Sequence, residues 1–129
     1  QMPLSKEIEI AQKFLDLLEA RNLDEVAELI TDDFVMVWPG GVRFDDLATL
    51  KEWGTGRFQS VKNIYDKIEA AETPMGNAVF FIGTLEGVFA DGSAFSGIRF
   101  VDRVLVTKGK VSELLVWSDL AEELRRRDL

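Results

Sequence analysis

The chain has 129 residues, the length of one ordinary domain, and its 47% hydrophobic and 29% charged residues are typical of a globular protein. Its formal net charge of −8 argues against nucleic acid and anionic membranes as partners, because their phosphates bind basic patches. Cysteine and histidine are absent, which excludes disulfides, cysteine or histidine zinc sites and any histidine general base.

The first half of the sequence predicts three helices and one strand. Apolar residues recur at spacings of three and four from Ser5 onward, which predicts an amphipathic helix that Asn22 ends in a left-handed turn. Asp24 caps a second, shorter helix, and residues 34–38 form a strand that the following proline and glycines stop. A third helix is predicted over residues 47–58.

The second half predicts four consecutive strands and a short final helix. The apolar period changes to two from Lys62, and turn residues separate the runs that follow. The later strands are expected at residues 78–89, 95–106 and 110–119, and the helix at residues 120–129.

This order of elements predicts the fold class and one mode of assembly. Helices followed by an antiparallel run indicate one α+β domain over residues 1–129, with the helices on one face of a curved sheet. Residues 78–82 are apolar at every position, as in a strand buried on both faces. A second copy of the chain covers the open face most simply, so we expect a homodimer through the open sheet face.

Two segments resemble a known family. They are KFLDLLEARNLDEVAELITDDFVMVW at residues 13–38 and FADGSAFSGIRFVDRVLVTKGKVSELLVWSDLAE at residues 89–122. With the order of elements, they resemble the nuclear transport factor 2-like superfamily and its SnoaL-like members. The resemblance implies a cone, formed by a strongly bent sheet wrapped over three N-terminal helices, with an apolar pocket inside. The superfamily includes cyclases, isomerases, hydrolases and non-enzymatic domains, so the fold alone chooses no function.

The resemblance implies that Asp119 is an acid–base residue. It looks like the aspartate of SnoaL-type cyclases and of limonene-epoxide hydrolases, whereas the residues alone also allow a helix cap or a salt bridge to nearby arginines. The hydrolases add an arginine and a second aspartate two residues apart. Here Arg99 and Asp102 are three apart, which puts them on opposite faces of a regular strand unless a bulge near Gly97 intervenes.

Two other chemistries of this fold lack their residues here. Phe14 and Trp38 stand where steroid isomerases carry a tyrosine donor and a base aspartate, and dehydratases need a histidine. Neither activity is therefore expected from the resemblance.

Asp102 is the second candidate catalytic residue. It shares one strand face with Phe100 and Val104, so we expect a buried carboxyl that needs a partner such as Tyr65 or Asp119. A salt bridge to an arginine is the alternative. Arg99 and Arg103 share the other face, where pairing at a dimer interface is the favoured role and ligand binding the alternative.

Six aromatic residues are candidates for binding a flat apolar ligand, and ordinary core packing is the alternative for each. They are Trp38, Trp53, Tyr65, Phe14, Phe81 and Trp117.

We therefore expect an enzyme without cofactor or metal that binds a small apolar or polycyclic molecule in the cone. Asp119 and Asp102 would carry acid–base chemistry of cyclase, isomerase or hydrolase type. A non-catalytic ligand-binding or oligomerisation domain is the alternative. No apolar run reaches the length of a membrane span and no signal-peptide pattern opens the chain, so the expected location is the cytoplasm.

Overall fold

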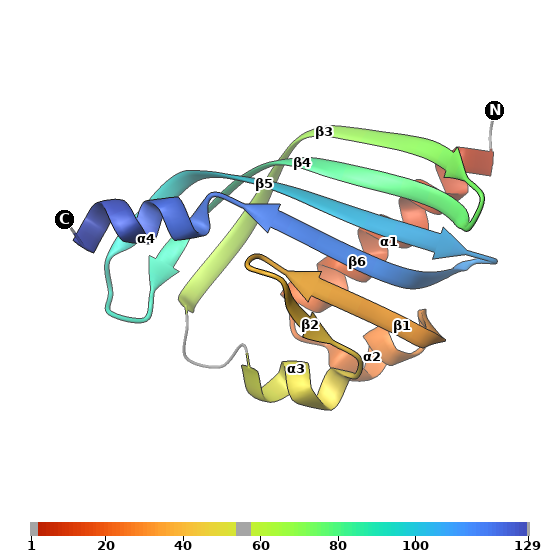
Figure 1. Ribbon diagram of the computed structural model, residues 1–129, viewed down its shortest axis with the longest axis horizontal. Coiled ribbons are helices and arrows are strands. Elements are labelled where there is room, and N and C mark those ends of the chain that lie inside the picture. The colour runs from red at the N-terminus through yellow and green to blue at the C-terminus, as the bar shows by residue number, and fades with distance from the viewer. Residues whose placement is uncertain (1–2, 54–57, 129) are drawn as a thin grey trace.

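The computed structural model describes residues 3–53 and 58–128, with side chains for residues 4–50 and 58–128 (Figure 1). The helices are α1 (Pro3–Glu19), α2 (Leu23–Ala27), α3 (Leu47–Trp53) and α4 (Leu120–Asp128). The strands are β1 (Ile30–Trp38), β2 (Val42–Phe44), β3 (Phe58–Thr73), β4 (Gly76–Phe89), β5 (Ala94–Thr107) and β6 (Lys110–Ser118).

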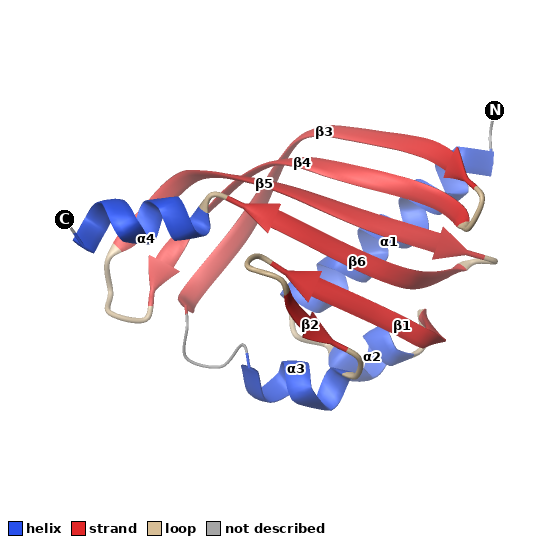
Figure 2. Cartoon of the chain, viewed as in Figure 1, coloured by secondary structure: helices blue, strands red, loops and turns tan. Residues whose placement is uncertain are grey.

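The strands form one open sheet in the order β2-β1-β6-β5-β4-β3. All neighbours are antiparallel except β1 and β6, which are parallel. Figure 2 shows α1 crossing one face of the sheet with α2 and α3 beside it, while α4 lies at one end. This arrangement confirms the predicted α+β cone with a bent, mostly antiparallel sheet.

Several boundaries differ from the sequence predictions. The short strand β2 was not predicted, and its Phe44 is buried in the main core. The residue with left-handed backbone after α1 is Arg21, with φ of 63°, and not Asn22. β3 begins at Phe58 and not at Lys62, because Phe58 already pairs with Phe89 of β4. Such pairing between distant residues is invisible to a local apolar period.

Two glycines of β4 allow the sheet to bend. A Cβ added to Gly83 would lie 1.8 Å from the carbonyl oxygen of Ile64, and one added to Gly87 would lie 2.2 Å from that of Ser60. Only glycine permits the backbone of β3 to approach so closely. The pairing of β3 with β4 shifts register between Tyr65 and Lys67 at the same level, as expected for a β-bulge.

The main core lies between α1 and the concave face of the sheet. Phe14 of α1 packs on Phe34 of β1 with ring centroids 5.8 Å apart, and both are buried. A second apolar cluster joins Leu120 of α4 to the bent ends of β4 and β5. Arg127 fastens α4 there by donating to the carbonyl oxygen of Ala94 at 2.7 Å. No helix in the described parts of the chain is long and apolar enough to cross a membrane.

In the described part of the chain, the convex face of the sheet carries no helix and is rich in apolar side chains. Register places Ile82, Val101 and Trp117 in one row across three strands, and Trp117 is 55% exposed. We call this surface the outer apolar patch; it comprises Val37, Phe80, Ile82, Val101, Leu115 and Trp117.

Candidate active site

Asp102 is the buried charged residue of the described structure. Its side chain lies in the core face of β5, where it pairs in register with Phe81 of β4 and Val116 of β6, and it is 6% exposed. Among residues 4–50 and 58–128, no side chain or backbone group forms a hydrogen bond or ion pair with its carboxyl. Burial, assisted by the negative charge of Glu19, raises the pKa of Asp102 to about 7. Its proton is therefore easily gained and lost near neutral pH.

Tyr65 lies near enough to Asp102 for the charge of that carboxylate to act on its hydroxyl. Its ring centroid is 5.2 Å from that of Phe81 and 6.1 Å from that of Phe100. The pKa of Tyr65 is raised to about 12, mainly by burial and further by the charge of Asp102. A hydrogen bond with the Asn63 side chain acts in the opposite direction and lowers this pKa. The hydroxyl thus stays protonated and can donate a hydrogen bond.

Two carboxylates of α1 form an acidic rim next to Tyr65, and the sequence analysis did not identify them. The charges of Asp16 and Glu19 both act on Tyr65. Burial raises the pKa of Glu19, although its carboxylate accepts a hydrogen bond from the backbone amide of Asn63. The spacing of three residues between Asp16 and Glu19 places them on one side of α1. That spacing could have been recognised in the sequence, but it does not predict that the two carboxylates lie next to β3.

Asp119 lies at the surface and is bonded to Arg99. The Nε of Arg99 donates to the Asp119 carboxylate at 2.5 Å, with the two side chains 81% and 40% exposed. The backbone of Asp119 also accepts from Glu123, so this residue leads into α4. The structure therefore has the salt bridge that was the alternative interpretation of Asp119, and its geometry does not join Asp119 to Asp102.

The arginines lie on the face of β5 opposite Asp102. Gly97 has a φ of 73° and lies in a bulge, but pairing with β4 is regular from Arg99 to Asp102. The bulge therefore does not bring these two residues to one face. Arg103 donates to Glu113 of β6 at 2.8 Å, also on the convex side.

The six predicted aromatic residues divide among several environments. Phe14 and Phe81 are fully buried, and Trp38 is partly buried against the main core. Trp117 lies on the convex face, which corrects the expectation that it lines the interior of the cone. The side chain of Trp53 lies outside the described residues.

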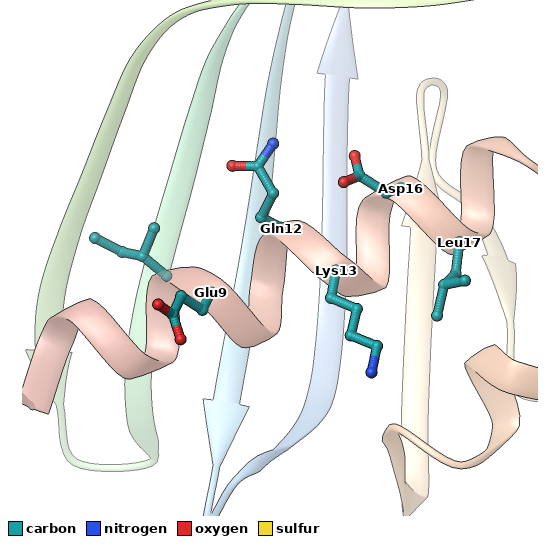
Figure 3. Close-up of a pocket in the computed structure, with 6 residues that line it drawn as sticks. Glu9, Gln12, Lys13, Asp16 and Leu17 are labelled. Atoms are coloured by element: carbon teal, nitrogen blue, oxygen red, sulfur yellow. The ribbon is translucent and has the colours of Figure 1, made fainter.

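A shallow depression of about 360 Å³ follows α1 (Figure 3). Its lining comprises Ile8, Glu9, Gln12, Lys13, Asp16 and Leu17. Figure 3 shows Gln12 and Asp16 on one side of the helix and Lys13 on the other. The depression shares Asp16 with the acidic rim but lies along the helix, so the apolar pocket expected inside the cone stays a prediction. The described residues contain no cluster of three or more potential metal ligands.

Comparisons with known proteins agree on family and fold. A model of the SnoaL-like domain matches residues 11–114. No curated protein matches the chain. A proposed SnoaL-like polyketide cyclase from Jannaschia sp. has 14% identity and a TM-score of 0.76, covering 96% of this chain and 93% of its own.

Two further solved structures have the same architecture. A nuclear transport factor 2-like protein of unknown function from Burkholderia pseudomallei has 16% identity and a TM-score of 0.74, covering 93% of this chain and 95% of its own. AclR, a proposed hydroxylase from Streptomyces galilaeus, has 16% identity and a TM-score of 0.70. The alignment covers 95% of this chain and 84% of AclR. At these identities the likeness shows the fold alone.

Proposed function

Because the chain belongs to the SnoaL-like domain family, we propose that it binds a small apolar carbonyl compound beside Asp102 and exchanges a proton with it. The observation that carries this proposal is the burial of Asp102 at the side of Tyr65. An acid–base group works best when its pKa is close to the ambient pH, and burial raises the pKa of Asp102 to about 7.

The two side chains have complementary roles in this proposal. The ionised carboxylate of Asp102 takes a proton from the carbon next to the carbonyl and later returns it. The hydroxyl of Tyr65 donates a hydrogen bond to the carbonyl oxygen, on which negative charge develops. Both steps belong to cyclase- or isomerase-type chemistry. Epoxide hydrolysis fits less well, since Arg99 is on the face opposite Asp102.

The test is proton exchange on a flat ketone. We expect the protein to accelerate deuterium uptake next to the carbonyl of 2-tetralone in D₂O, as followed by NMR. Asp102→Asn keeps the size of the side chain but cannot take the proton, so exchange falls by about 100-fold or more. Glu72→Gln, at an exposed position of β3, is the matched control and keeps the full rate.

Asp119 is the competing candidate, and the same assay separates the two. Asp119→Asn removes the partner of Arg99 at the surface and leaves exchange unchanged if Asp102 is the acid–base residue. Loss of exchange in Asp119→Asn but not in Asp102→Asn would move the role to Asp119. No acceleration by the wild-type protein would instead favour a non-catalytic binding domain.

We also propose a homodimer formed by the outer apolar patch. Trp117 of this patch is 55% exposed and the other members are half-buried, and apolar side chains grouped on an open surface mark an interaction site. Since the patch lies on the opposite side of the sheet from Asp102, the dimer leaves the proposed site accessible.

A further inference from the structure

The charged groups around the Asp102 site have mostly one sign. The charges that act on Tyr65 are those of Asp102, Asp16 and Glu19, which are all acidic and come from two different elements. Lys62 of β3 acts on Glu19 and partly offsets it. A ligand entering beside Tyr65 therefore meets a negative electrostatic potential.

Aromatic residues surround Asp102 in the sheet. Phe81 is the register partner of Asp102, and Tyr65 and Phe100 flank Gly83 in the neighbouring row of the sheet. Because Gly83 has no side chain, the rings of Tyr65 and Phe100 come within 6.1 Å of each other across it. Ring faces beside carboxylates are the combination that attracts organic cations.

The carboxyl of Asp102 also lacks a counter-charge. It is more than nine-tenths buried, and within the described residues no hydrogen bond or ion pair is known for it. A buried unpaired carboxylate is strongly unfavourable, whereas a buried carboxylate with a bound ammonium group has its partner.

We propose that the Asp102 site selects an apolar molecule carrying a protonated amine over neutral and anionic molecules of the same shape. The ammonium group binds between Asp102 and Glu19, and the apolar body packs on Tyr65, whose ring is only partly buried. This inference rests on the proposed function, because it assumes that the ligand binds beside Asp102.

Binding of such a cation is coupled to proton release. The cation binds the ionised form of Asp102, so its affinity rises with pH up to about pH 7 and then levels off. The other titratable groups that face the site are Asp16 and Glu19 of α1 and Tyr65 and Lys62 of β3. The affinity falls again when the amine itself loses its proton, at about pH 9–10.

Three ligands with one ring system provide the test. We would measure binding of 2-(aminomethyl)naphthalene, 2-naphthalenemethanol and 2-naphthoate by isothermal titration calorimetry at pH 7.5. We expect the amine to bind most tightly, the alcohol next and the carboxylate most weakly. The affinity of the amine should exceed that of the alcohol by at least about tenfold. Further titrations at pH 6.5 in phosphate and ACES buffers, which differ in ionisation enthalpy, should reveal proton release with the amine only.

Variants decide whether Asp102 is responsible. Asp102→Asn should remove the preference for the amine and the proton release, while Glu72→Gln keeps both. Glu19→Gln changes an exposed position and should reduce the preference for the amine by roughly threefold. This second variant tests the charge preference if the Asp102→Asn protein does not fold.

The outcomes separate this inference from the proposed function. Equal binding of alcohol and amine, or a preference that survives Asp102→Asn, overturns the inference and leaves proton exchange on 2-tetralone unaffected. Absence of binding by all three ligands overturns the inference and the small-ligand proposal together.

Discussion

Asp102 is unfavourable for folding at the pH where the proposed proton transfer requires its ionised form. In the unfolded chain its pKa is near 3.8, and burial raises that pKa to about 7 in the folded protein. Below pH 4 the carboxyl is protonated in both states, and its burial costs little. Between about pH 4 and pH 7 the unfolded chain ionises this carboxyl while the folded protein keeps its proton, so the folded state loses stability as the pH rises, and the loss levels off above about pH 7.

Asp102→Asn should therefore stabilise the protein in a pH-dependent manner. At pH 4 the variant and the wild type should have similar free energies of unfolding. At pH 8 the variant should be more stable by up to about 4 kcal/mol, because it avoids a buried carboxylate. Urea titrations at both pH values measure the difference, and Glu72→Gln should show none. An equal effect of Asp102→Asn at both pH values would contradict the raised pKa.

At the scale of elements, β4 determines the shape of the site. Its glycines permit β3 to bend over β4, and the register shift after Tyr65 alters which side chains of β3 face the interior. A strict period of two places Tyr65 and Ile68 on opposite faces. In the structure, Tyr65 pairs with Gly83 and Ile68 pairs with Phe81. Gly83 and Phe81 lie on the concave face, so Tyr65 and Ile68 share that face.

Gly83→Ala should disrupt this bend. The new Cβ would come 1.8 Å from the carbonyl oxygen of Ile64, a backbone atom that cannot turn away, so β3 and β4 must separate. We expect a loss of roughly 2–4 kcal/mol in the free energy of unfolding, measured by urea denaturation. Ser60→Ala, at an exposed position of β3, should change it by less than about 0.5 kcal/mol. A Gly83→Ala protein as stable as the wild type would mean that β3 does not approach β4 so closely.

The whole molecule presents two faces of different character. The concave face is covered by α1 and contains the core and Asp102, whereas the convex face leaves the outer apolar patch in contact with water. A sheet of this kind gains stability when a second copy covers the patch, since apolar surface leaves water.

The dimer proposal is tested by a charge at the centre of the outer apolar patch. Val101 lies between Ile82 and Trp117 in register, so Val101→Lys places an unpaired ammonium group in the interface and should weaken the dimer by at least about tenfold. Sedimentation velocity should show a dimer for the wild type and for Ala27→Lys, an exposed change in α2, and a monomer for Val101→Lys. A wild-type protein that sediments as a monomer at every concentration would contradict the proposal.

The local pattern of the sequence was sufficient for the two faces of β5 and for most elements, but not for the strand β2 or the start of β3. Alternation along one strand needs no knowledge of its neighbours, which is why the burial of Asp102 and the opposite placement of Arg99 were predictable. The order of helices before antiparallel strands was likewise sufficient for the α+β class.

Only the tertiary structure decided which residues meet at the site. Asp16 and Glu19 approach Tyr65 because α1 packs against the bent β3, and no local period relates residues so far apart in the chain. Asp119 pairs with Arg99 for the same reason, since the register of β5 and β6 sets that contact. The sequence by itself determined the side of β5 on which Asp102 and Arg99 lie, because that alternation depends on backbone geometry, whereas on β3 the register shift after Tyr65 changed the alternation. Bending and packing determined its neighbours, because they depend on the whole chain.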